Sequence, residues 1–204
     1  MLSVMTAVSL REQHAEATRE RILGAVAELL ERGEAEELTM PDVAEASGVS
    51  LRTVYRYYPT REQLLEAAGR WIGDELLRHP YPRTLNEVSE LFRVGCRDFD
   101  ERPGLVRALS LSQLGQSVRG YRRRERLDAI RRVLRDEVGD LPEEELRRAE
   151  AVLAYLHNML AYTVLRDESG LSGDEIGQAL GWAIETLVDD LRRRNRKAKK
   201  GVGR

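Results

Sequence analysis

Residues 39–61, TMPDVAEASGVSLRTVYRYYPTR, predict two short helices that are joined by a tight turn and followed by the start of a third helix. Thr39 is a good N-cap for the first helix, and Asp42, three residues later, can bond back to it. Gly48 is placed to end that helix, because glycine tolerates the left-handed backbone that closes many helices. Ser50 then caps the second helix.

The second short helix carries a surface that suits an anionic partner. From residue 50 to residue 61 the chain has three arginines, three tyrosines, three hydroxyl side chains and no acid. A helix of about seven residues buries too little to fold alone, so we expect its exposed side chains to serve recognition. Arginine, tyrosine and hydroxyl side chains are hydrogen-bond donors that can contact base edges in the major groove of DNA.

This stretch resembles the DNA-binding region of the TetR family of bacterial transcriptional regulators. In the family pattern, a helix that ends in Gly is followed by Leu-Thr and a short helix with the sequence AxxxGVS at its end. A second short helix containing Thr-Val-Tyr follows, and then a basic residue and a long helix. The matching residues here are Gly33, Leu38, Thr39, AEASGVS over 44–50, TVYRYY over 53–58, and Arg61. The likeness covers residues 18–71, with Tyr58 where Phe is usual and Arg61 where Lys is usual.

The resemblance also implies which residues contact DNA. Arg52 lies in the first turn of the second helix, where side chains reach base edges, and Arg to guanine is the commonest specific contact. In the family, the basic residue that Arg61 matches contacts the phosphate backbone, and the free N–H groups of a helix start favour such a contact. The residues that we expect at a palindromic, double-stranded operator are Thr39, Ser50, Leu51, Arg52, Thr53, Tyr55, Tyr57 and Arg61.

Composition and charge limit the other possibilities. The chain has 204 residues, 42% of them hydrophobic and 33% charged, which is enough for a core and a soluble surface. The single Cys96 argues against a disulfide framework or a multi-cysteine metal site, so we expect no metal and no cofactor. Residues 1–17 lack the apolar run of an export signal and no stretch approaches a membrane span, so we expect a cytoplasmic protein. The net charge of −2 does not indicate nucleic-acid binding, but the distribution of charge matters more than its sum.

The rest of the chain predicts an all-α protein of about nine helices, because apolar residues recur at helical spacing and no strand pattern or internal repeat is present. We expect residues 1–60 to form an N-terminal arm and the helix-turn-helix domain, and residues 61–191 to form a helical regulatory and dimerisation domain. Residues 192–204 hold eight basic residues and no acid, which predicts a disordered tail. Such a tail either keeps the chain soluble or adds sequence-independent affinity for DNA.

Residues 117–138 predict a very basic helix with Leu127, Ile130 and Leu134 facing inward. Its arginines could form a second contact with nucleic acid. We interpret them instead as a solvated helix face with ion pairs between residues four apart.

Wide apolar stripes over about 145–165 and 175–191 predict two helices that are buried on more than one side. In the TetR family the last two helices pair with their copies, so the resemblance implies a homodimer through these segments. The larger domain of the family usually holds a small-molecule pocket whose ligand releases DNA. The candidate pocket residues, each equally explained as core or helix surface, are Trp71, Cys96, Phe99, Gln113, His157, Asn158 and Tyr162.

Three classes of function follow from these observations. The resemblance favours a homodimeric repressor that a small molecule releases from its operator. The alternative is a DNA-binding regulator or activator that needs no ligand. An enzyme is much less favoured, because no catalytic triad, metal-binding spacing or phosphate-binding glycine loop is visible and the three histidines are scattered.

Overall fold

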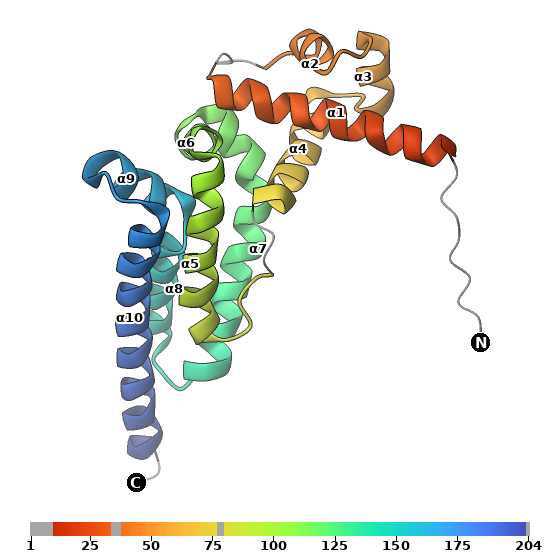
Figure 1. Cartoon of the computed structure of the whole chain (residues 1–204). Helices are drawn as coiled ribbons and strands as arrows, with labels where there is room; N and C mark the ends of the chain where they lie inside the picture. The colour runs from red at the N-terminus through yellow and green to blue at the C-terminus, as the bar shows by residue number, and fades with distance from the viewer. Residues whose placement is uncertain (1–9, 34–37, 77–79, 203–204) are drawn as a thin grey trace, which may run out of the picture.

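The computed structural model describes residues 10–33, 38–76 and 80–202, and these residues form ten α-helices and no strand (Figure 1). The all-α class predicted from the sequence is therefore confirmed. The helices are α1 (Leu10–Arg32), α2 (Met40–Ser47), α3 (Leu51–Tyr57), α4 (Arg61–Leu76), α5 (Leu85–Glu101), α6 (Pro103–Leu111), α7 (Gln113–Val138), α8 (Glu143–Leu156), α9 (Met159–Ser169) and α10 (Gly173–Val202). Residues 1–9 of the expected N-terminal arm lie outside the described residues. In the described ranges no helix combines the length and the apolar character that crossing a bilayer requires.

One expected helix is two helices in the structure. The apolar stripe over residues 145–165 predicts a single helix, but α8 ends at Leu156 and α9 begins at Met159. Asn158 has an extended backbone, and its side chain accepts a hydrogen bond from the backbone N–H of Leu160 at 3.1 Å. An asparagine in such a position satisfies the free N–H groups of a new helix, and this cap separates the two segments.

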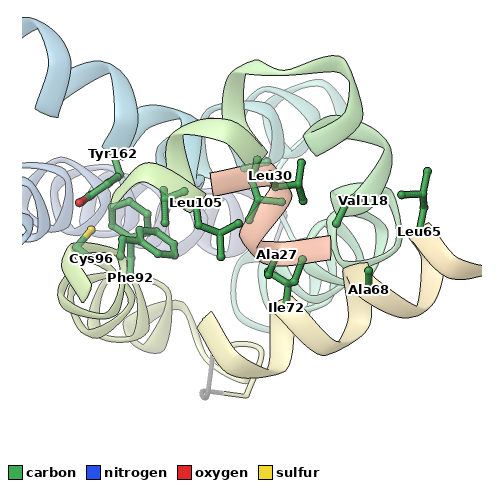
Figure 2. Close-up of a cluster of buried hydrophobic side chains, with 14 of the residues drawn as sticks. Ala27, Leu30, Leu65, Ala68, Ile72, Phe92, Cys96, Leu105, Val118 and Tyr162 are labelled. Carbon is green, nitrogen blue, oxygen red and sulfur yellow. The ribbon is translucent and has the colours of Figure 1, made fainter. Parts of the chain in front are cut away.

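The first three helices lie at one end of the molecule and α4 connects them to the remaining helices, among which α5, α7, α8 and α10 run side by side (Figure 1). The two parts share buried contacts. Figure 2 shows Ala27 and Leu30 of α1 in one cluster with Ile72 of α4, Leu105 of α6 and Val118 of α7. α4 therefore packs against the part formed by the first three helices and against the part formed by the remaining helices, so it can connect the two parts mechanically. The domain boundary between residues 60 and 61 stays a prediction.

The expectation of a disordered tail is wrong for residues 192–202, which continue α10. Arg192 pairs with Glu137 of α7 at 2.5 Å, and Lys199 pairs with Asp140 at 3.0 Å. Asn195 is buried, and its side-chain oxygen accepts a hydrogen bond from the backbone N–H of Asp140 at 3.0 Å. A run of positive charge in the sequence could not reveal this, because the partners lie about 55 positions away. The last two residues of the expected tail, 203 and 204, lie outside the described residues.

Deleting residues 192–204 is expected to lower the free energy of unfolding by about 2–4 kcal/mol. The deletion leaves the Asp140 backbone and the Glu137 carboxylate without the groups that Asn195 and Arg192 supply, and each unmet polar group is costly. Denaturant unfolding followed by circular dichroism measures the effect. A chain that lacks only residues 201–204 is the control and should unfold like the full chain. Equal stability of the longer deletion would contradict the role given to these contacts.

Candidate nucleic-acid interface

The α2–α3 unit is closed by the side-chain caps that the sequence predicts. The backbone N–H and the hydroxyl of Thr39 donate to the carboxylate of Asp42 at 2.9 and 2.6 Å, and these bonds lower the pKa of Asp42. Gly48 has the left-handed backbone, with φ 65°. The Ser50 hydroxyl accepts a hydrogen bond from the backbone N–H of Thr53 at 3.2 Å. The angle between α2 and α3 is therefore fixed by local residues.

Two arginines from outside this unit hold it in place, and the sequence did not indicate either contact. Arg21 of α1 donates from one guanidinium nitrogen to the carbonyls of Ser47 and Gly48, at 2.8 and 3.3 Å. Arg61, the first residue of α4, donates from Nε to the carbonyl of Leu38 at 2.7 Å. No local pattern reveals these bonds, because their partners are 23 or more positions away. Arg61 thus lies at the helix start that was expected, with part of its guanidinium group engaged within the chain.

The outer face of α3 is basic and aromatic. Val54 is the buried residue of this helix, while Leu51 and Tyr55 are 40% and 47% exposed. Arg52 and Arg56 are also exposed. Six of the eight expected contact residues lie on α3 or cap it, namely Ser50, Leu51, Arg52, Thr53, Tyr55 and Tyr57. The other two, Thr39 and Arg61, are the cap of α2 and the first residue of α4.

Tyr57 is half-buried between two cationic side chains. The guanidinium carbon of Arg56 lies 5.2 Å from the centre of the Tyr57 ring, and that of Arg19 in α1 lies 5.6 Å from it. Cations within about 6 Å of a ring face are attracted to it. Arg19 therefore joins α1 to this surface, although its place in the sequence gave no clear sign of that contact.

A cavity of about 100 Å³ lies in the larger part of the molecule. Its wall is mostly apolar and includes Ile72 of α4, Leu91 of α5, Leu109 of α6 and Val118 of α7. Three arginines of α7 and His157, which lies between α8 and α9, add polar groups to the wall. The cavity therefore lies where α4 meets the larger helical part.

Of the seven candidate pocket residues, His157 lines this cavity and the other six lie elsewhere. Cys96, Phe99 and Tyr162 are buried in the core, where the rings of Phe99 and Tyr162 meet edge to face with centres 5.1 Å apart. The Tyr162 hydroxyl donates to Asp100 at 2.6 Å. Burial raises the pKa of Cys96 to about 12, so this residue is a neutral thiol.

The remaining three candidates occupy helix surfaces and ends. Trp71 is half-buried on α4 and faces Gly24 of α1, where an added methyl group would lie 3.8 Å from the indole ring. Gln113 is the exposed first residue of α7, and Asn158 is the cap of α9. Their part in ligand binding stays a prediction.

The interpretation of residues 117–138 as a solvated basic face with ion pairs between residues four apart is correct only in part. Arg131 and Arg135 at one end of α7 are exposed, as expected, but their ion pairs are with another helix. Arg131 pairs with Glu150 at 2.6 Å and Arg135 pairs with Glu143 at 2.7 Å, both on the neighbouring α8. Arg126, in contrast, lines the cavity. The signal that could have revealed this is the inward stripe of α7, since Arg126 precedes the buried Ile130 by four residues.

α2 and α3 meet at a glycine turn, and α3 exposes basic and aromatic side chains. This is the architecture of a helix-turn-helix protein. Residues 22–68 match the family described as bacterial regulatory proteins, tetR family. The DNA-binding part of the chain is therefore similar to the corresponding part of this family. The resemblance expected from the sequence is therefore confirmed.

Two curated relatives match parts of the chain. Nucleoid occlusion factor SlmA of Vibrio cholerae is 31% identical over 99 residues, which are 45% of this chain and 50% of that protein. The HTH-type transcriptional repressor LfrR of Mycolicibacterium smegmatis is 39% identical over 70 residues, which are 34% of this chain and 36% of that protein. The chain thus spans half or less of the length of the curated relatives that it matches.

Solved structures match over more of the chain but with lower identity. NalD, the secondary repressor of the MexAB-OprM multidrug efflux pump in Pseudomonas aeruginosa, aligns with a TM-score of 0.62 and 15% identity over 85% of this chain and 96% of that chain. A TetR transcriptional regulator from Rhodococcus sp. RHA1 aligns with a TM-score of 0.52 and 22% identity over 85% and 97%. These likenesses establish the fold of the larger part.

Proposed function

We propose that this chain is a homodimeric, sequence-specific DNA-binding regulator, and that it is a repressor which a small molecule releases from its operator. The observation that carries the proposal is α3, a capped helix with one buried residue and an outer face of arginine and tyrosine. Residues 1–60 would read DNA, and the helices that follow would bind the ligand and form the dimer. LfrR and NalD are each named as repressors, which supports this direction of control.

Exposed apolar side chains on α8 and α10 support the dimer. Trp182 of α10 is 69% exposed, and Tyr155 and Val152 of α8 are 56% and 47% exposed. α8 contains the first part of the expected segment 145–165 and α10 contains the expected segment 175–191, and the two helices contact each other. Large exposed apolar groups on neighbouring helices are typical of an interface, and a two-fold dimer matches a palindromic operator.

α4 offers a path between ligand and DNA. Its first residue, Arg61, follows α3 closely, while Gly69, Ile72 and Gly73 further along the same helix line the cavity. A ligand that moves this part of α4 would change the separation of the two α3 helices, which DNA requires at about 34 Å. By linkage, such a ligand must bind the DNA-free form more tightly, and DNA must weaken its binding by the same factor.

Replacing Arg52 with alanine is expected to weaken operator binding by about 1–3 kcal/mol and to relax the preference at one base pair in each half-site. The reason is that Arg52 is exposed in the first turn of α3, where it can bond a guanine edge with two hydrogen bonds. Fluorescence anisotropy with the operator and with single-base variants measures both effects.

The control for this prediction is Arg124→Ala, which removes an exposed arginine from α7 and should leave operator affinity unchanged. An equal loss on operator and on random DNA would make Arg52 a phosphate contact and contradict the proposed reading role.

A regulator that acts without a ligand is the second candidate, and the small volume of the cavity favours it. The volume of about 100 Å³ is below the roughly 300–1,000 Å³ of most ligand pockets. A band-shift assay on DNA upstream of the coding region tests whether the chain binds DNA at all. Release of that DNA by a small molecule supports the first candidate, and persistent binding in the presence of every cavity ligand supports the second.

A further inference from the structure

The cavity has an apolar wall on most sides and a cationic wall along α7. Arg119, Arg123 and Arg126 all line it, and their spacing of four and three residues places them on one face of the helix. His157 lines it from the junction of α8 and α9. Among the described residues of the lining there is no Asp or Glu.

The positive charge of this wall is not balanced within the described part of the chain. The Nε atoms of Arg119 and Arg126 are inaccessible to solvent and have no hydrogen-bond partner there. The other contacts of Arg119 are long and go to neutral groups, the Asn158 side-chain oxygen and the Ser110 carbonyl, both at 3.4 Å. Burial, together with Arg119 and Arg123 nearby, lowers the pKa of Arg126 to about 10. Since a buried charge without a counter-charge is costly, an anion in the cavity would stabilise the site.

The side chains of His157 and Glu125 also agree with an anion in the cavity. Both ring nitrogens of His157 are inaccessible to solvent and lack a partner among the described residues. Burial, assisted by the charge of Arg126, lowers the pKa of His157 to about 4, so the ring is neutral at pH 7 and has one N–H to donate. Glu125, the acid beside Arg126 in the sequence, accepts a hydrogen bond from the Tyr81 hydroxyl at 2.6 Å and is not part of the lining.

We propose that this cavity binds a small amphipathic organic acid, whose carboxylate pairs with Arg119 and Arg126 and accepts a hydrogen bond from His157. Arg123 also lines the cavity and is exposed, so its charge can attract the anion from solvent. The apolar body of the acid packs on the walls formed by Ile72, Leu91, Leu109 and Val118. The role of this acid as the effector rests on the proposed function above, while its binding does not.

The size and the charge of the site set its selectivity. A cavity of about 150 Å³ holds a benzene ring, so this cavity of about 100 Å³ must widen by side-chain movement to take one ring or a short chain, and larger bodies are excluded. A neutral analogue would leave the arginines without a counter-charge, and a cation would be repelled. The site therefore selects acids against amides and amines of the same shape.

Calorimetric titration of the DNA-free, full-length protein tests this selectivity. The probes are benzoate and hexanoate, the matched amides, and benzylamine. We expect at least one acid to bind, with an affinity at least about tenfold above that of its amide, and we expect no binding of benzylamine. An amide or amine that binds as tightly as the matching acid overturns the proposal, as does the absence of binding by both acids at millimolar concentration.

The variant Arg126→Met locates the binding, because it keeps most of the apolar stem and removes the charge. We expect benzoate or hexanoate affinity to fall at least about tenfold and the melting temperature of the free protein to rise, since an unpaired buried charge is removed. Arg124→Met, an exposed position on the same helix, is the matched control and should change neither quantity. Unchanged acid affinity in Arg126→Met overturns the proposal.

If Arg126→Met does not fold, Arg126→Lys decides the question. Lysine keeps the charge but lacks the planar fork that pairs with a carboxylate through two bonds. Weaker acid binding than in the wild type supports the proposal, and unchanged acid binding overturns it.

Operator binding is measured separately, so that the two proposals can fail independently. Acid binding in the cavity with no effect on operator affinity supports this inference and contradicts the role of the acid as the effector. Release of the operator by a neutral or cationic compound, with no binding of the acids, overturns this inference and supports ligand release.

Discussion

A Trp182→Glu variant is expected to be a monomer and to lose most of its operator affinity. Trp182 is 69% exposed on α10, in the segment that we propose to pair with its copy. In a two-fold interface the substitution places a carboxylate against apolar surface twice. A buried charge without a partner costs about 3–5 kcal/mol, so the dissociation constant of the dimer should rise by about 1,000-fold or more.

Size-exclusion chromatography with light scattering measures the mass of the particle. The helical content should not change, because Trp182 contributes little to the core of one protomer. Leu111→Glu is the matched control, since Leu111 is 46% exposed but lies on α6, outside the proposed interface. A Trp182→Glu protein that stays dimeric would place the interface elsewhere.

The loss of operator affinity follows from the loss of the dimer. A monomer presents one α3 helix and contacts one half-site, so it lacks the second set of contacts that the palindrome provides. Anisotropy titrations at concentrations at which the wild type is dimeric should show this loss on the full operator. On a single half-site, the variant and the wild type should bind alike.

Local signals in the sequence predicted the α2–α3 unit well, because the residues that fix it are close neighbours in the chain. Thr39 caps with Asp42, Ser50 caps with Thr53, and Gly48 supplies the left-handed turn. Such interactions depend on residue type and a spacing of a few positions, and both are visible in the sequence. The bonds from Arg21 and Arg61 depend on tertiary placement and were not visible.

The larger part of the chain was predicted less well for the same physical reason. The charged end of α10 is ordered by Glu137 and Asp140, which are distant in the sequence, so composition alone indicated a disordered tail. The single residue Asn158 divides an apolar pattern into α8 and α9. Arg126 faces the cavity only because α7 packs against α4 and α5, a fact that the charge pattern of one helix does not contain.

Gly69 is the position on α4 where a small change should have the largest effect on the connection between cavity and DNA-binding helices. A β-carbon at Gly69 would lie 2.0 Å from the carbonyl oxygen of Val118 in α7 and 3.0 Å from its carbon. The neighbouring atoms are backbone, so a rotamer change cannot relieve the overlap and the helices must separate. Both residues also line the cavity.

Gly69→Ala is therefore expected to lower the free energy of unfolding by about 1–3 kcal/mol or more, which is the usual cost of overpacking. It should also weaken operator binding, because any displacement of α4 from α7 is carried to Arg61 and α3 at the start of the same helix. Denaturant unfolding gives the first quantity. Anisotropy titrations at a temperature at which the variant is fully folded give the second.

Gly120→Ala is the control, since a β-carbon at Gly120 of α7 would meet nothing within 4 Å. Alanine is the better helix former, so this variant should be as stable as the wild type or more stable by up to about 1 kcal/mol, with unchanged operator affinity. If Gly69→Ala matched Gly120→Ala in both measurements, the close approach of α4 and α7 would be adaptable. A helix that yields so easily at the cavity could not move α3, and the proposed path from ligand to DNA would be wrong.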